Sequence, residues 1–171
     1  TITAEHFDAH DPPQIFVSRW VDYSAKYGLG FMLSNQTSGV HFNDSSKLVS
    51  EQDSKTFVHI QREKSKHDNA TTYTLDYFPK ELNKKVELFK NFSKYLYQNK
   101  NATKSSYLTM PDNPKTVKVG SIYIKKWTKT SHGIIFCLSN QLVQVHFKDG
   151  TELFINSNLK VVTFINKEKE T

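Results

Sequence analysis

The sequence of this 171-residue chain contains one pattern twice, at a constant offset of 105 residues. The matching segments are 28–36 with 133–141 and 40–44 with 145–149, and the register continues to Leu48 with Leu153 and Ile60 with Ile165. No gap interrupts this register, so a chance match of short motifs does not explain it. A period this long that occurs twice predicts two copies of a small domain rather than a solenoid.

Both copies have the pattern of an antiparallel β-meander. Apolar residues of the first copy recur at a period of two, which is typical of strands with one buried face. These residues are Phe31, Leu33, Val40 and Phe42. The polar residues 35–38 predict a hairpin turn, and Asp149-Gly150 in the second copy is a strong hairpin signal. Residues 71–77 are β-branched and aromatic and predict a further strand.

An amphipathic helix is predicted to follow this strand. Pro79 suits a first helical position, and Lys94 and Lys100 lie near the C-terminal end, where the helix dipole favours cations. The apolar residues of this segment recur at spacings of three and four: Leu82, Val86, Phe89, Phe92 and Leu96, with Leu88 and Tyr95 widening the stripe. A meander with one helix across it belongs to the α+β class.

The repeat also divides the chain into segments. We expect a flexible leader over 1–15, a first copy over 16–100, a linker over 101–118 and a second copy over 119–171. Neither copy can bury a large core alone, so their sheets are expected to pack on each other as a sandwich. The second copy lacks counterparts of the last strand and the helix, so it is expected to be completed by further sequence or by another chain.

Composition excludes several classes of protein. Cys137 is the single cysteine, so no disulfide can form within the chain, and it is predicted to be a core residue. Neither a signal peptide nor a membrane-spanning run is present, which favours an intracellular protein. No cofactor motif and no second pair of metal ligands is found, so neither a cofactor nor a metal is predicted.

The net charge of +6 is concentrated in one segment of the chain. Residues 80–129 hold twelve lysines against three acidic residues, a net charge of +9, which leaves −3 for the rest. The segment is interpreted either as solvated surface or as a surface for an anionic partner. Nucleic acid and membrane are disfavoured as partners, because no nucleic-acid-binding motif and no membrane segment accompany the charge.

No set of residues with the pattern of a catalytic site is found. A nucleophile with its base, paired carboxylates and the protein-kinase signatures are all missing from the sequence. His41 and His146 occupy equivalent positions of the repeat, which favours a structural role common to both strands. We therefore predict a non-catalytic chain.

Three segments resemble a known family. Residues 16–24 (FVSRWVDYS) and 26–31 (KYGLGF) closely resemble the opening of the first polo box in polo-like kinases, and 39–45 (GVHFNDS) resembles its next strand and turn. The duplicated Leu-Ser-Asn-x-x-x-x-Val-x-Phe pattern is similar to the family's tandem pair. The resemblance covers about residues 16–165 and implies two homologous polo boxes, with a Ser/Thr kinase domain N-terminal to Thr1.

The resemblance also implies a cleft between the boxes that binds Ser/Thr peptides. Trp20, followed by Val21 and Asp22, matches the tryptophan that packs beside the phosphosite, next to free backbone of the first strand. Tyr95 and Lys100 complete the expected peptide-binding set. An aromatic groove under the helix of the first box is also implied, formed by Tyr23, Tyr27, Phe92 and Tyr95.

The sequence departs from the family where phosphate should be held. The family places a His and a Lys two apart, just after an Asp; after Asp149 those positions are Gly150 and Glu152. A carboxylate that faces a phosphate dianion would repel it, so we expect weakened or absent phosphate dependence. His146 and Lys148 resemble the pair in spelling but lie upstream of it. The candidate phosphate contacts are therefore Lys129, His146, Lys148 and Lys100.

The leading hypothesis is a docking module of a polo-like kinase. It would bind phosphorylated or unphosphorylated Ser/Thr peptides, restrain its own kinase domain, and target the kinase to mitotic structures. By resemblance these lie in the cytoplasm and nucleus, at centrosome, kinetochore and spindle. The alternative is a constitutive assembly scaffold or homodimer that binds partners independently of phosphorylation.

Overall fold

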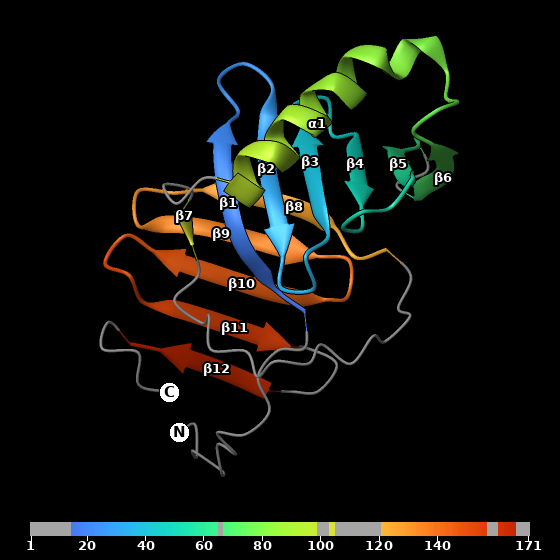
Figure 1. Cartoon of the computed structure of the whole chain (residues 1–171). Helices are drawn as coiled ribbons and strands as arrows, with labels where there is room; N and C mark the ends of the chain where they lie inside the picture. The colour runs from blue at the N-terminus through green and yellow to red at the C-terminus, as the bar shows by residue number, and fades with distance from the viewer. Residues whose placement is uncertain (1–14, 65–66, 99–102, 105–120, 157–160, 167–171) are drawn as a thin grey trace.

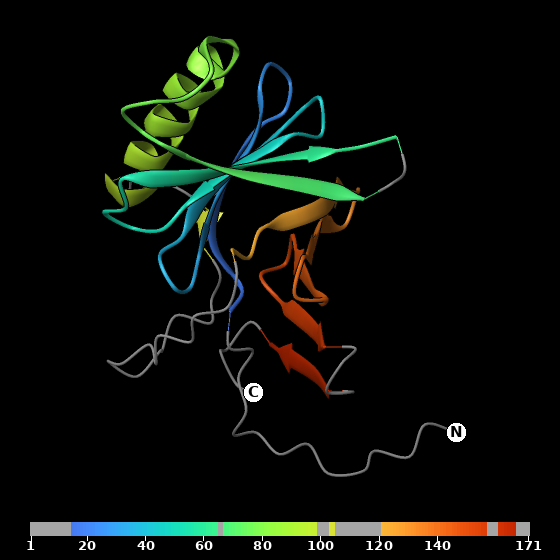
Figure 2. The same cartoon turned by 90° about the vertical axis from the view of Figure 1, so that its right-hand side faces the viewer.

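The structure is a computed structural model that describes residues 15–64, 67–98, 103–104, 121–156 and 161–166. These residues form two antiparallel sheets and one long helix (Figure 1). The strands of the second sheet run across those of the first, and the helix lies on the opposite side of the first sheet (Figure 2). The predicted α+β class and the sandwich of two sheets are therefore confirmed.

The first sheet is a six-strand meander extended by a short strand from the linker. Its strands are β1 (Val17–Tyr23), β2 (Gly28–Leu33), β3 (Ser38–Phe42), β4 (Lys47–Ser50), β5 (Thr56–Arg62), β6 (Asp68–Thr74) and β7 (Thr103–Lys104). Their spatial order is β6-β5-β4-β3-β2-β1-β7. Each strand pairs with its neighbour in sequence except β7, which returns to pair with β1.

The second sheet is a five-strand meander with the same connectivity. Its strands are β8 (Ile124–Lys129), β9 (Gly133–Leu138), β10 (Leu142–Phe147), β11 (Glu152–Asn156) and β12 (Val161–Ile165), in that spatial order. Residues 121–156 and 161–166 contain no helix. Within the described residues, the outer face of this sheet therefore has no counterpart of the helix on the first sheet.

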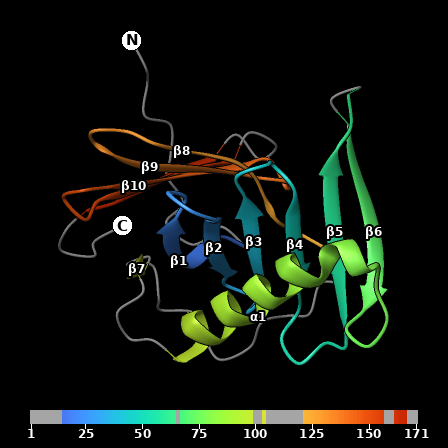
Figure 3. The ribbon, with the colours of Figure 1, turned by 90° about the horizontal axis from the view of Figure 1, so that it is seen from above.

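The helix begins with a 3-10 turn, η1 (Lys80–Leu82), and continues as α1 (Asn83–Gln98). Its buried residues are those of the predicted stripe, namely Leu82, Val86, Phe89, Phe92 and Leu96, which confirms that prediction. The helix lies along the outer face of the first sheet (Figure 3), and these side chains pack against that face. The contact is closest at Gly30, where a Cβ would lie 2.6 Å from the Phe92 ring. Only glycine at this position allows the helix to approach the strand so closely.

The repeat in sequence is also a repeat in geometry. Trp20 pairs with Phe31 in the first sheet, as Trp127 pairs with Phe136 in the second. Gly28 and Gly133 face a phenylalanine, and the backbone carbonyl of the histidine before it approaches so closely that a Cβ would lie 2.3 and 2.2 Å from its oxygen. The same backbone path is therefore built twice.

The main core lies between the sheets and takes residues from both. Phe16 of the first copy contacts Phe154 of the second edge to face, with ring centroids 5.6 Å apart. A polar contact also joins the copies, because the Tyr123 hydroxyl donates to Asp68 at 2.7 Å. Lys47, which is buried, lies 3.8 Å from the same carboxylate. Buried aromatic side chains contribute roughly 1.5–3 kcal/mol each to the free energy of folding.

The prediction that Cys137 is a core residue is wrong. Its neighbours Phe136 and Leu138 are buried against the first sheet, so Cys137 points to the opposite face of β9 and is half-buried there. The equivalent residue in the first copy, Met32, is buried because Leu96 of α1 covers it. The two residues differ in burial because α1 covers the outer face of the first sheet, whereas no helix among the described residues covers that face of the second sheet.

Parts of the predicted segmentation fall outside the described residues. Of the predicted leader over 1–15 the structure describes only Ile15. Of the predicted linker over 101–118 it describes only residues 103–104. Those two linker residues form β7. The segment boundaries themselves stay a prediction. None of the helices in the described part of the chain is long and apolar enough to span a bilayer.

Candidate functional site: the cleft between the sheets

A cleft of about 310 Å³ opens where the two sheets meet. The first sheet contributes β1 and β7 to its wall, and the second sheet contributes the ends of β8, β9 and β10. The lining residues are Trp20, Asp22, Thr103, Lys129, Thr130, Gly133, Ile134, His146 and Lys148. The cleft therefore joins residues that are separated by more than a hundred positions in sequence.

The indole of Trp20 forms the apolar floor of the cleft. It contacts the rings of Phe136 and His146 edge to face, with centroids 5.1 and 4.8 Å away. Trp20 is only 4% exposed, so it belongs to the core between the sheets as well as to the cleft wall. Such ring contacts stabilise the geometry of both sheets at this point.

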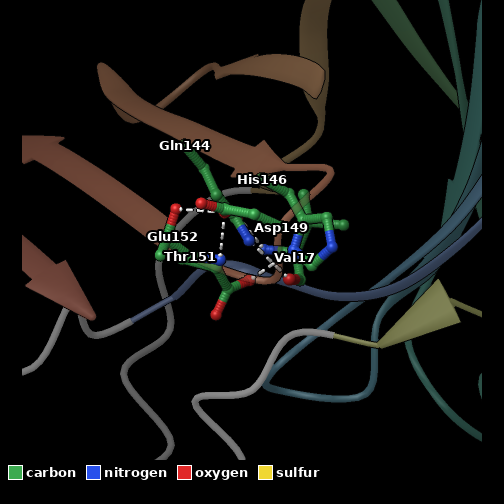
Figure 4. A network of polar contacts seen from close by, with 6 residues as sticks. All are labelled: Val17, Gln144, His146, Asp149, Thr151 and Glu152. Atoms are coloured by element: carbon green, nitrogen blue, oxygen red, sulfur yellow. Dashed lines mark hydrogen bonds and ion pairs between the residues drawn. The ribbon is translucent and has the colours of Figure 1, made fainter. Parts of the chain in front are cut away.

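The start of β1 is held against the second sheet by one buried side chain. The Gln144 amide accepts a hydrogen bond from the Val17 N–H at 2.8 Å and donates to the Val17 carbonyl at 2.9 Å (Figure 4). Gln144 is fully buried, so the loss of these bonds would leave polar groups without partners. Gln144 therefore positions the strand that carries Trp20.

An ion pair closes one side of the cleft. Lys129 of β8 donates to Asp22 of β1 at 3.0 Å, which joins the two sheets at the surface. Burial alone would raise the pKa of Asp22, but hydrogen bonds from Ser24 and Lys129 outweigh it and lower the pKa below its usual value. Part of the positive charge of Lys129 is therefore already compensated.

The end of β10 contributes an imidazole and a lysine to the cleft. His146 and Lys148 both line it. Nδ1 of His146 lies 3.1 Å from Oε1 of Glu152, which is fully buried on the neighbouring strand β11. The expectation that Glu152 faces the phosphate is therefore wrong, because the alternation of β11 turns its side chain inward behind His146. Gly150 lies in the turn before β11 and is not among the residues that line the cleft.

The structure brings together five of the residues predicted from the sequence: Trp20, Asp22, Lys129, His146 and Lys148. Two others lie elsewhere, because Val21 packs under α1 and Tyr95 is exposed on that helix. Lys100 lies outside the described residues. Sequence reasoning missed Gln144, although a polar residue in the buried phase of a strand is a signal for it.

The edge of β1 beside Trp20 is not free. Strand β7 pairs with it antiparallel, with Arg19 opposite Lys104 and Trp20 opposite Thr103. The expectation of free strand backbone next to the tryptophan is therefore wrong for Arg19 and Trp20. The linker occupies these backbone positions, and Thr103 lies in the cleft. No signal in the linker sequence indicated this pairing.

The aromatic residues under the helix are partly grouped. The rings of Tyr23 and Phe92 contact edge to face at 5.8 Å, and Tyr23 is half exposed. Tyr27 packs against the core under α1, and Lys26 lies over its ring at 5.1 Å. Tyr23 and Tyr95 thus present aromatic surface, whereas Tyr27 and Phe92 belong to the core.

The cleft has no group of side chains suited to a metal. Among the described residues, no three His, Cys, Asp or Glu side chains are arranged to hold an ion. The cleft has the chemistry of a recognition site. It has one apolar wall, two lysines, an imidazole, and the β1 backbone groups that pair with β7.

A family model described as the duplicated region of the polo box matches residues 25–86 and 130–171. The chain therefore belongs to the polo-box family. As a polo-box domain it is a non-catalytic regulatory region.

Two curated relatives and one solved structure place the chain within this family. It is 44% identical over 159 residues to a probable serine/threonine-protein kinase of Zea mays, CCRP1, and covers 24% of that protein with 92% of its own length. It is 32% identical over 168 residues to the serine/threonine-protein kinase PLK1 of Xenopus tropicalis. That match covers 27% of PLK1 and 95% of this chain. The chain thus spans about a quarter of the length of these relatives.

The solved structure is the budding yeast Cdc5 polo-box domain in complex with an Spc72 phosphopeptide. The TM-score is 0.74 at 26% identity, and the match covers 94% of this chain and 58% of that one.

Proposed function

We propose that this chain is a docking module of a polo-like kinase that binds Ser/Thr peptides of partner proteins in the cleft between its two sheets. The observation that carries the proposal is the convergence of Trp20, Lys129, His146 and Lys148 on one cleft. An apolar wall beside cationic donors suits a peptide with a phosphorylated side chain. The yeast relative that was solved with a phosphopeptide supports the same ligand class.

Lys129, His146 and Lys148 are the groups that would contact the phosphate. The positive potential of the cleft is partly compensated, because Lys129 already pairs with Asp22 and the Glu152 carboxylate lies next to His146. A charge-assisted hydrogen bond contributes roughly 1.5–3 kcal/mol. Phosphorylation should therefore improve peptide affinity by about tenfold to a hundredfold, because the cleft is less positive than its lysines alone suggest.

The peptide backbone has two ways to use β1. It can displace β7 from Arg19 and Trp20, or it can lie along β7 and leave that pairing intact. Strand addition to a sheet edge provides affinity through main-chain hydrogen bonds, while the cleft provides specificity. Displacement is the simpler route, because β7 is two residues long and its pairing is correspondingly weak.

In the full-length protein the module would target a kinase domain to its partners and restrain that domain. The kinase names of both relatives support this proposal. The same family membership supports the proposal that the module acts inside the cell at mitotic structures.

The test is a titration of one peptide with and without its phosphate. Lys148→Met and Lys129→Met should each weaken binding of the phosphopeptide about tenfold and leave the unphosphorylated form nearly unchanged. Lys126→Met is the matched control, because Lys126 is exposed on the same strand as Lys129 but does not line the cleft. Trp20→Phe, which keeps an aromatic side chain in the core, should weaken both forms of the peptide.

Two outcomes would contradict the proposal. Equal effects of Lys126→Met and Lys148→Met would mean that this cleft is not the site. A thousandfold preference for the phosphopeptide would show that the compensation by Asp22 and Glu152 has been overestimated.

A second function, assembly, is favoured by the outer face of the second sheet. Val162 and Phe164 on the edge strand β12 are exposed, with 40% and 52% of their surface accessible. Exposed apolar residues on an edge strand are typical of an association surface. Sedimentation velocity over a wide concentration range tests this function, since a monomer at every concentration would argue against self-association.

A further inference from the structure

In each copy a histidine is paired across strands with a buried ionisable residue. The two ionisable residues have opposite charges. In the first sheet His41 pairs across strands with Lys47, and in the second sheet His146 pairs with Glu152. Positions 47 and 152 are 105 apart, so they are the same position of the repeat. The two copies can therefore be compared directly, because the histidine is the same in both and its cross-strand partner is a lysine in one and a carboxylate in the other.

In the first copy the buried partner disfavours a protonated histidine. Lys47 is 1% exposed. Burial, followed by the positive charge of Lys47, lowers the pKa of His41 below its usual value. His41 does not line the cleft.

In the second copy the partner is a carboxylate and the histidine lines the cleft. Glu152 is fully buried, and its Oε1 lies 3.1 Å from Nδ1 of His146. This contact uses Nδ1 and leaves Nε2 as the ring nitrogen available to a ligand in the cleft. An ionised carboxylate only accepts hydrogen bonds, so Nδ1 must then carry a proton. Neutral His146 in that tautomer has a lone pair on Nε2, which cannot donate to phosphate.

We propose that His146 and Glu152 form a proton-coupled phosphate-binding pair, in which one proton is taken up by the pair when Nε2 of His146 donates to a phosphate oxygen. This rests on the proposed function, namely that the cleft binds phosphorylated peptides. Glu152 is a positioning residue here: it holds the imidazole by Nδ1 and balances the imidazolium charge that a bound phosphate requires. The carboxylate that would repel a phosphate if it faced the cleft instead supports binding from behind the ring.

The other charged groups around His146 do not replace this proton. Lys129 and Lys148 line the cleft from β8 and from the turn after β10, and Asp22 lines it from β1. Asp22 is already bound to Lys129. The remaining neighbours on β1 and β9 carry no charge: the Trp20 ring contacts the imidazole edge to face, and Ile134 is the cross-strand partner of His146. Glu152 is therefore the ionisable side chain that contacts the imidazole directly.

The sign of the pH dependence follows from the proton uptake. Binding that takes up one proton weakens as pH rises, with a slope of up to tenfold per pH unit. Between pH 7 and 8.5 a phosphothreonine side chain is already close to a dianion, because its second pKa is about 6. The titration of the ligand therefore contributes little in this range.

The experiment is isothermal calorimetry with one phosphothreonine peptide in buffers that differ in ionisation enthalpy, at pH 7 to 8.5. The wild type should take up between about 0.3 and 1 proton per peptide, and its affinity should fall about three- to thirtyfold over this range. Glu152→Gln should abolish both effects. Its amide N–H can donate to Nδ1, so neutral His146 keeps a proton on Nε2 and donates without uptake.

Two controls separate this role from a merely structural one. His146→Asn should also abolish proton uptake, whereas His41→Asn, the equivalent change in the first copy, should leave it as in the wild type. The ¹⁵N signals of the His146 ring provide a second readout that needs no activity. Addition of the peptide should move both nitrogens toward the imidazolium position in the wild type, while Glu152→Gln keeps the neutral Nε2–H pattern.

The outcomes distinguish this inference from the proposed function. Phosphopeptide binding without proton uptake, or uptake that persists in Glu152→Gln, would overturn the pair and leave the docking function intact. If no phosphopeptide binds in the cleft, the docking function fails. The inference then fails with it, unless inorganic phosphate alone moves the His146 ring signals in a Glu152-dependent way.

Discussion

The first five strands of the two copies follow the same path and differ in what covers them. In the first copy, α1 lies on the outer face of the sheet and buries Val40, Phe42 and Leu48. In the second copy, the equivalent face carries only half-buried or exposed side chains among the described residues, ending at Val162 and Phe164 on β12. The comparison teaches that the strands do not need the helix to adopt their register, because both sheets share the glycine at positions 28 and 133 and the same turn conformation at Gln36 and Gln141.

The glycines show where the copies have diverged. Gly30 of the first copy corresponds to Ile135 of the second, and the difference follows from the helix, since Phe92 lies on Gly30. Gly39 corresponds to Gln144, whose long side chain reaches Val17 across the interface. A Cβ at Gly39 would lie 2.4 Å from the Phe31 ring. One copy has thus specialised in packing a helix, and the other in holding β1.

The largest effect is expected at the two equivalent tryptophans. Trp20→Ala should destabilise the fold by about 3–5 kcal/mol, because Trp20 is almost fully buried between the sheets. Trp127→Ala should cost about 1–2 kcal/mol, because Trp127 is half-buried beside the same core. Urea denaturation followed by circular dichroism measures both values. Equal losses would show that the two positions are energetically equivalent in spite of their different burial.

The next effect concerns the contact between the helix and the first sheet. Gly30→Ala should destabilise by about 1–3 kcal/mol, because the added methyl would lie 2.6 Å from Phe92 and force α1 away from β2. Ile135→Ala, the change at the equivalent position, should cost about 1 kcal/mol or less, since that side chain is only half-buried. If Gly30→Ala were neutral in the same denaturation experiment, the helix would not be packed as tightly as the structure indicates.

A smaller effect, on peptide affinity, is expected from the difference between the edges of the two sheets. Strand β7 covers β1, whereas β8, the equivalent edge of the second sheet, has no partner strand on that side among the described residues. Thr103→Pro removes an N–H from β7 and weakens its pairing with Trp20. Peptide affinity should then rise about three- to tenfold if the peptide displaces β7. Fluorescence anisotropy measures it, and a fall in affinity would mean that β7 is part of the binding surface.

The smallest effect is expected at a partly exposed ion pair between the helix and a turn. Burial alone would raise the pKa of Asp44, but hydrogen bonds from Lys85 and Ser46 lower it to about 2. A lowered pKa stabilises the fold above the unfolded value near 3.8, and this contribution is lost as pH falls toward 2. Lys85→Met should therefore cost a few tenths of a kcal/mol at pH 7, because Asp44 is largely exposed, and the cost should shrink as pH falls toward 2. Lys84→Met, at an exposed neighbour, is the control for a general charge effect.

Much of the architecture could be predicted because it depends on local periodicity. The helix was predicted from Pro79 to Lys100, and the structure has it from Lys80 to Gln98. The strand predicted over 71–77 is found as β6 at 68–74, shifted because a turn, bridged by Thr74 and Tyr77, begins at the end of the predicted segment. Predictions that depended on a neighbouring element were less successful, as the half-buried Cys137 shows.

By itself, the sequence determined that the chain is built twice, that each copy is a meander, and which face of the helix is buried. These properties follow from spacing along the chain, since apolar periods of two and of three to four report directly on strands and helices. The sequence also carried Trp20, Lys129, His146 and Lys148, but as separate positions. Only the tertiary structure decided that they share one cleft, that β7 covers β1 beside Trp20, and that Glu152 lies behind His146. These facts depend on how two sheets cross and on the inward phase of β11, which no local pattern encodes.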